Sequence, residues 1–77
     1  MNHLDILVLV DGFIKDNGYP PTRTEIAIMM GSGSPNASQY HLLNLEKKGL
    51  INVKRNISRG IVISAKGKKA LAESRKN

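Results

Sequence analysis

The sequence contains no cysteine and no long hydrophobic run. Without cysteine the chain can form neither a disulfide framework nor a thiolate metal site, which agrees with a reducing cytoplasm. The longest apolar run, Ile6 to Val10, is far too short to span a bilayer, and Asp5 stands before it where a signal peptide would be basic. We therefore expect a soluble, cytoplasmic protein that is stabilised by packing alone.

Acidic residues are scarce in the second half of the chain. Residues 1–46 carry five acidic residues against two basic ones, whereas residues 47–77 carry ten basic residues against Glu73 alone. This uneven distribution of a net charge of +6 indicates a surface that binds a polyanion. A lysine-rich tail that only improves solubility is the alternative, and the tail alone does not decide between them.

The length and the composition predict one folded domain that covers residues 1–77. A chain of 77 residues is near the lower limit for unaided folding, so a second domain is excluded. The content of 40% hydrophobic and 23% charged residues is typical of globular proteins and not of disordered chains.

The first segment carries two conflicting signals. The β-favouring run Ile6–Val10 and the turn dipeptide Asp11–Gly12 favour a hairpin. Residues of the same run also form a helical stripe with Ile14, and Asn17–Gly18 is a good helix stop. We predict a helix over His3–Asn17.

Two further helices have clear start and stop signals. Thr22 and Glu25 form a capping box that begins a short helix, which ends at Gly31. Ser34 suits the N-cap and Pro35 the first position of the next helix, which runs for about 14 residues until Lys47, Lys48 and Gly49 close it.

After these helices the pattern changes to alternation. Ile51 and Val53, a turn over residues 56–60, and then Ile61 and Ile63 predict a two-stranded hairpin. The segment from Ala65 to Lys76 is basic and is interrupted by Gly67, so we expect a short helix or a frayed tail.

This order of elements is typical of a winged helix-turn-helix domain, a mainly α fold of three helices with a small β-hairpin as its wing. Such a domain places its third helix in the DNA major groove. The helical period puts two sets of side chains on opposite faces of this helix. The packing face has Ser38, His41, Leu42 and Leu45, and the exposed face has Asn36, Gln39, Tyr40, Leu43 and Lys47.

The exposed face suits base recognition. Asn36 and Gln39 can each present a donor and an acceptor to adenine, Ser34 can contact bases or phosphate, and Lys47 can anchor a phosphate. The alternative is that Ser34 is only an N-cap and that the two amides are only solvated. Cations beside the hairpin turn, which could reach phosphates or the minor groove, are Lys54, Arg55 and Arg59.

Several stretches together resemble the DNA-binding domain of the LexA repressor family, without a gap from about Ile6 to Ile63. The combination is more specific than any of its pieces. The stretches are Gly18–Ala27, Ser34–Ala37, His41–Leu42, Lys48–Gly49 and Ser58–Ile61.

The resemblance implies a winged helix-turn-helix regulator from a bacterium or a bacteriophage that reads a CTGT-type half-site in double-stranded DNA. The residues that it points to in the third helix are Ser34, Asn36, Ala37, Gln39 and Tyr40. The family pattern has acidic residues at the last two positions, so the preferred bases differ there. Arg59 falls in the family's wing motif, and Lys54 and Arg55 are further wing candidates.

Other functions have less support in the sequence. We expect no enzyme, no metal and no cofactor, because His3 is the only histidine partner for His41 and because no nucleophile is paired with a base. The chain ends at Asn77, so we expect no self-cleaving domain. Alternatives to a nucleoid-associated regulator are an architectural or recombination-directionality factor and a module that pairs with a LexA-like protein. A weak homodimer on DNA is a further expectation.

Overall fold

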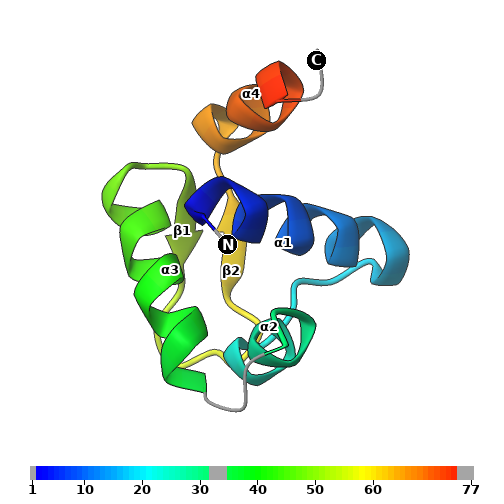
Figure 1. Cartoon of the computed structure of the whole chain (residues 1–77), viewed down its shortest axis with the longest axis vertical. Helices are drawn as coiled ribbons and strands as arrows, with labels where there is room; N and C mark the ends of the chain where they lie inside the picture. Colours follow the sequence, from blue (N-terminus) through cyan, green and yellow to red (C-terminus); the bar gives the residue numbers. More distant parts are fainter. Residues whose placement is uncertain (1, 32–34, 75–77) are drawn as a thin grey trace.

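The computed structural model describes residues 2–31 and 35–74 (Figure 1). The predicted N-cap residue, Ser34, lies outside the described residues. No helix within these two ranges is long and apolar enough to cross a membrane. Along the described residues the elements are α1 (His3–Asn17), α2 (Arg23–Met29), α3 (Pro35–Lys47), β1 (Ile51–Val53), β2 (Ile61–Ile63) and α4 (Ala65–Ser74).

Helix α1 has the predicted bounds. Asn2 and Asp5 form a capping box in which the Asn2 side chain accepts from the Asp5 amide at 2.9 Å. At the other end Gly18 has a φ of 81°, and its amide donates to the carbonyl of Ile14 at 2.7 Å. The helix forms despite its β-favouring run because one face, which includes Ile6 and Val10, is buried in the core.

The predicted capping box also begins α2. The Thr22 hydroxyl accepts from the Glu25 amide at 3.1 Å, and the Glu25 carboxylate accepts from the Thr22 amide at 2.8 Å. Gly31 follows the helix with a φ of 77°, and Gly49 follows α3 with a φ of 76°. Both glycines therefore occupy the left-handed conformation that ends a helix.

The two strands pair antiparallel as predicted. Ile51 is opposite Ile63 and Val53 is opposite Ile61, which turns the isoleucines toward the helices. Beyond the strands, the Lys54 amide donates to the Gly60 carbonyl at 2.9 Å and closes the base of the loop. This loop, residues 54–60, is the wing tip.

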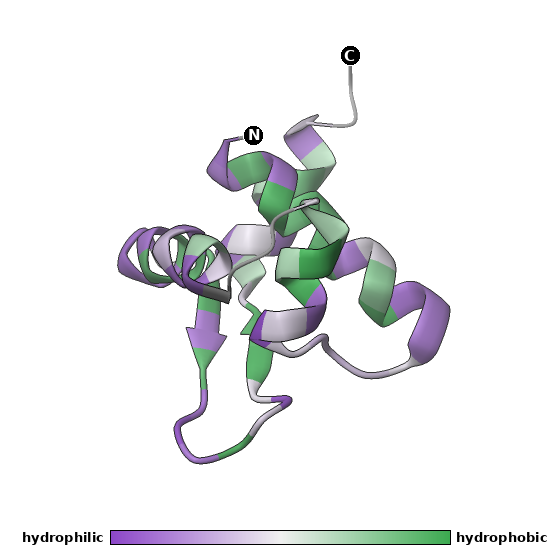
Figure 2. Cartoon of the chain, turned by 60° about the horizontal axis from the view of Figure 1, so that its bottom comes forward, coloured by the Kyte–Doolittle hydropathy of each residue, from purple (hydrophilic) through white to green (hydrophobic). Residues whose placement is uncertain are grey.

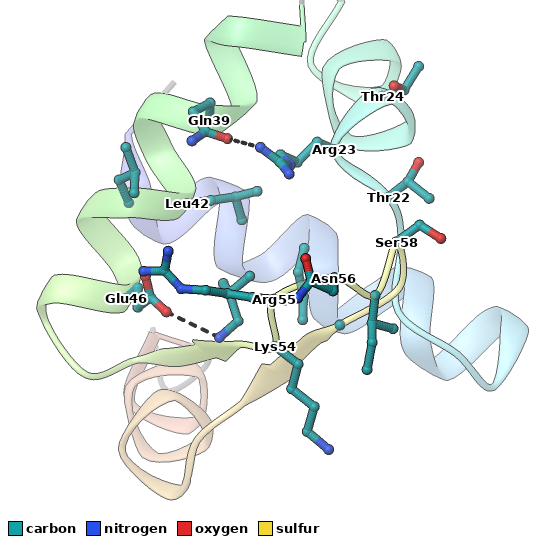
Figure 3. Close-up of a pocket in the computed structure, with 15 residues that line it drawn as sticks. Thr22, Arg23, Thr24, Gln39, Leu42, Glu46, Lys54, Arg55, Asn56 and Ser58 are labelled. Atoms are coloured by element: carbon teal, nitrogen blue, oxygen red, sulfur yellow. Dashed lines mark hydrogen bonds between the residues drawn. The ribbon is translucent and has the colours of Figure 1, made fainter.

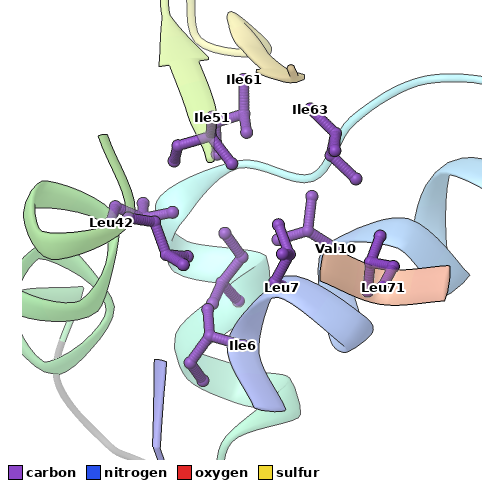
Figure 4. Close-up of a cluster of buried hydrophobic side chains, with 10 residues drawn as sticks. Ile6, Leu7, Val10, Leu42, Ile51, Ile61, Ile63 and Leu71 are labelled. Atoms are coloured by element: carbon purple, nitrogen blue, oxygen red, sulfur yellow. The ribbon is translucent and has the colours of Figure 1, made fainter. Parts of the chain in front are cut away.

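One hydrophobic core lies between the helices and the hairpin (Figure 4). In Figure 2 the hydrophobic segments of the helices turn to the centre, while the wing tip is largely hydrophilic and projects from the body. The core holds side chains from every element: Ile6, Leu7, Val10, Ile26, Leu42, Leu45, Ile51, Ile61, Ile63 and Leu71.

Over Ala65–Ser74 the tail is a helix, so the first of the two predicted alternatives is right for these residues. The expected interruption at Gly67 is wrong, because this glycine lies buried inside α4, where an added Cβ would be 2.1 Å from the Leu50 carbonyl oxygen. Ser64 caps the helix, since its hydroxyl accepts from the Gly67 amide at 3.0 Å. Leu71 then completes the core against α1.

Candidate nucleic-acid interface

The two faces of α3 differ as predicted. Leu42 and Leu45 are buried, and the hydroxyl of buried Ser38 donates to the carbonyl of Arg23 at 2.9 Å. On the opposite face Tyr40 is 62% exposed and Leu43 is 54% exposed. Helix α3 therefore rests on α1, α2 and β1 and leaves one face open to a partner.

The remaining candidates on α3 are exposed to different degrees. Asn36 is exposed, whereas Ala37 and Gln39 are half-buried. Gln39 is half-buried beside α2, where the Arg23 guanidinium donates a hydrogen bond to its side-chain oxygen (Figure 3). Sequence reasoning gave Arg23 no role, because spacing along the chain does not show which residue of α2 lies opposite α3.

A groove of about 670 Å³ separates α3 from the wing. Its walls come from the start of α2, from α3, from residues 53–58 and from Gly60 and Ile61. The side chains of Glu46 and Arg55 point toward one another across it (Figure 3). The Glu46 carboxylate also accepts from the Val53 amide at 3.3 Å, which ties α3 to the first strand. Helix α3 and the wing thus border one concave surface.

The three cations predicted for the wing have different surroundings. All three are exposed, and the Lys54 side chain points away from the groove (Figure 3). Arg59 instead faces the body of the domain, where its guanidinium pairs with the Glu25 carboxylate at 2.6 Å.

This pairing shifts both groups. The hydrogen bond from Arg59 and that from the Thr22 amide lower the pKa of Glu25 to about 2. The hydrogen bond to Glu25 raises the pKa of Arg59. The Arg59 guanidinium also lies 4.6 Å from the centre of the Tyr19 ring.

Helix α3 meets α1 at a cluster of three rings, where Tyr40 and His41 lie against His3. The Nδ1 atoms of His3 and His41 are 2.9 Å apart, and the Tyr40 ring lies 5.6 Å from the His3 ring and 5.4 Å from the His41 ring. Burial lowers the pKa of His41, and the charge on His3 lowers it further. His41 is thus a half-buried packing residue, as the sequence predicted, with His3 as its partner.

Lys47, the last residue of α3, is exposed near the end of the helix that faces α4, away from the wing tip (Figure 1). The structure thus brings Gln39, Lys54 and Arg55 to one groove, which Arg59 does not line. It places Tyr40 beside α1 and Lys47 at the C-terminal end of α3.

The sequence profile of the family described as the LexA DNA binding domain matches residues 2–60. The chain belongs to this family. Membership of the LexA DNA-binding domain family confirms the predicted winged helix-turn-helix fold and makes the chain a DNA-binding domain.

Individual relatives agree with this assignment. The chain is similar to the LexA repressor of Pseudomonas chlororaphis, with 49% identity over 59 residues, and to that of Polaromonas naphthalenivorans (strain CJ2), with 47% identity over 70 residues. These alignments cover 77% and 91% of this chain but only 29% and 30% of the relatives. The chain therefore spans less than a third of the length of either relative.

Proposed function

We propose that this domain is a sequence-selective transcription regulator of the repressor type that binds double-stranded DNA. Helix α3 enters the major groove, and the wing lies on the adjacent backbone or minor groove. The observation that carries the proposal is the shared groove between the exposed face of α3 and the cationic wing tip, in a chain of the LexA DNA-binding domain family. The domain would bind DNA at the nucleoid in the cytoplasm and would catalyse no reaction.

The dimensions of α3 support insertion into DNA. A helix of 13 residues is about 20 Å long, and the major groove, about 12 Å wide, admits a helix. Asn36 and Ala37, near the start of α3, and Gln39, one turn further on, would face base edges, while Ser34 precedes the helix. Lys54 and Arg55 would bind phosphates beside the groove, and Lys47 would be an anchor near the far end of α3.

Oligomeric state is part of the proposal. We expect a monomer in free solution, with pairing only on DNA that carries two half-sites, because one such module buries a small DNA interface. Sedimentation at micromolar concentration should give the monomer mass, and a stable dimer without DNA would contradict this expectation.

The test is selection of binding sites from random duplex DNA, followed by affinity measurements on a selected site and on random duplex. Asn36→Ala should reduce affinity for the selected site by about 5- to 150-fold and change affinity for random duplex little, because a good base contact is worth about 1–3 kcal/mol of discrimination. Lys69→Ala, which changes an exposed residue of α4, is the control and should affect both DNAs equally.

The same experiment separates the alternatives. Equal losses on both DNAs in the Asn36 variant, or no enriched sequence, would favour an architectural or recombination-directionality factor. No binding to DNA by the unmodified domain would favour a module that pairs with a LexA-like protein, which a shift assay with added repressor would detect.

A further inference from the structure

Arg59 lies at the end of the wing tip, yet its side chain contacts the body of the domain. One nitrogen, Nη1, donates to the Glu25 Oε1 at 2.6 Å and to the Pro20 carbonyl at 3.0 Å. The other, Nη2, donates to the Glu25 Oε2 at 3.2 Å. The Cζ atom of the guanidinium lies over the Tyr19 ring, 4.6 Å from its centre.

This set of contacts fits arginine and not lysine. Only the guanidinium fork can satisfy both oxygens of a carboxylate, donate to a carbonyl and also lie over an aromatic ring. We name this set of side chains, Tyr19, Glu25 and Arg59, the wing clasp.

Glu25 and Tyr19, the partners of Arg59 in the wing clasp, are themselves held by contacts within the body of the domain. The carboxylate that binds Arg59 also accepts from the Thr22 amide at 2.8 Å, as part of the capping box of α2. Tyr19 is in turn packed against Phe13 of α1, with ring centres 5.8 Å apart. The end of the wing tip is therefore fixed to both the first and the second helix.

The wing needs the contacts of Arg59 to hold its position, because its strands are short. Each strand has three residues, and a two-stranded hairpin is only marginally stable by itself. At the base of the loop, an added Cβ on Gly60 would be 2.5 Å from the Lys54 carbonyl oxygen, so the two ends of the wing tip are in close contact. Contacts that hold Arg59 in place therefore also hold Lys54 in position.

We propose that Arg59 is a positioning residue that fixes the wing through the wing clasp, and that the phosphate contacts of the wing come from Lys54 and Arg55. The consequence for DNA affinity rests on the function proposed above. The order of the wing in the DNA-free domain does not rest on it, so the two can be tested separately.

Glu25→Gln is the most informative variant. Glutamine keeps an acceptor for the Thr22 amide, since capping boxes use Glu or Gln, but it removes the charge that binds Arg59. If Arg59 bound phosphate directly, removing this nearby anion would raise DNA affinity or leave it unchanged. The wing clasp instead predicts a several-fold loss of affinity for the selected site, similar to the loss in Arg59→Ala.

The comparison has matched controls. Glu73→Gln, which changes an exposed residue of α4, makes the same change in net charge far from the wing and should not weaken binding. Combining Glu25→Gln with Arg59→Ala should add little to either single change, because both break the same interaction. Higher affinity in Glu25→Gln, or fully additive losses, would overturn the proposal.

A second measurement needs no DNA. Heteronuclear NOE values for the amides of residues 54–60 report motion of the wing tip on the nanosecond timescale. They should fall in Glu25→Gln and in Arg59→Ala and recover only in part in Arg59→Lys, while the amides of α2 and α3 keep their values and show that the fold is intact.

Unchanged wing values in both variants would overturn the positioning role, whatever the DNA data show. Suppose that NOE values for the wing tip fall in both variants but the unmodified domain binds no DNA. The positioning role of Arg59 would then stand, and the proposed function would be overturned. The two proposals therefore fail by different results.

Discussion

The guanidinium of Arg23, the first residue of α2, donates a hydrogen bond to the side-chain oxygen of Gln39 on α3. The acceptor end of this amide is therefore held toward α2, and its NH₂ group points away from Arg23 (Figure 3). Gln39 then offers DNA a donor more readily than an acceptor. The paired donor and acceptor contacts to adenine that the side chain allows in principle are restricted by this bond.

This geometry predicts the base preference at one position of the site. A fixed donor favours a base with major-groove acceptors, such as guanine or thymine, and disfavours cytosine, which presents a donor there. Arg23→Ala should release the amide and broaden the selected base at the position read by Gln39, with little change elsewhere. Site selection with both proteins measures this, and an identical preference at every position would contradict the prediction.

Binding should be strongly dependent on salt. Each phosphate contact lowers the logarithm of affinity by about 0.9 for each logarithmic unit of salt, because bound counterions are released. Lys54→Ala and Arg55→Ala should each flatten this slope by about one contact, while Lys69→Ala should leave it unchanged. If neither wing variant changes the slope, the phosphate contacts lie elsewhere, with Lys47 as the next candidate.

The sequence predicted the fold better than the site. Caps and stops are local, so Thr22, Glu25 and Gly49 could be recognised from neighbouring residues. The hydrogen-bond partners of Arg59 are 34 and 39 residues away, so spacing along the chain could not show its ion pair with Glu25. The pairing of Arg23 with Gln39 depends on how α2 and α3 cross, which spacing along the chain does not encode.

Acid should weaken the wing clasp in a defined range of pH. The pKa of Glu25 in the folded domain is about 2, below its ordinary value of 4.5, so its contribution to stability is complete above pH 4.5. That contribution is lost as pH falls from 4.5 to about 2. Urea unfolding across this range should show a smaller loss in Glu25→Gln than in the unmodified domain, with Glu73→Gln as the control. The difference should shrink in high salt, because the pair is on the surface.

His41 should add a second dependence on pH at higher values. Its pKa in the folded domain is lowered from 6.5, chiefly by burial, so the unfolded chain takes up a proton more readily. Stability should therefore begin to fall as pH drops below 6.5 and continue to fall until the folded state is also protonated. His41→Asn, which can keep a hydrogen bond to His3 but does not titrate, should flatten this fall.

His3→Asn separates burial from charge at this site. Because burial is the larger cause, most of the dependence should persist when only His3 is replaced. Urea midpoints at about pH 7.5 and about pH 5 measure stability on the two sides of the ordinary histidine pKa. Complete loss of the dependence in His3→Asn would show that the charge of His3, and not burial, governs His41.

Two helical glycines should respond to alanine with opposite signs. Gly12 lies within α1. Apart from its chain neighbours and the nearby backbone of α1, no described atom lies within 4 Å of an added Cβ there. Gly12→Ala should stabilise the domain by about 0.5–1 kcal/mol, because alanine has the better helix propensity. Local propensity alone predicts the same gain at Gly67, which also lies within a helix.

Packing reverses the sign at Gly67. An added Cβ would be 2.1 Å from the Leu50 carbonyl oxygen and 2.9 Å from a methyl group of Ile63. The carbonyl cannot move away easily, because it accepts from the Ser64 amide at 3.1 Å. Gly67→Ala should therefore destabilise the domain by about 1–3 kcal/mol, as overpacking does. Urea unfolding of both variants measures the contrast, and a stabilised Gly67→Ala domain would mean that α4 does not pack on the core through this contact.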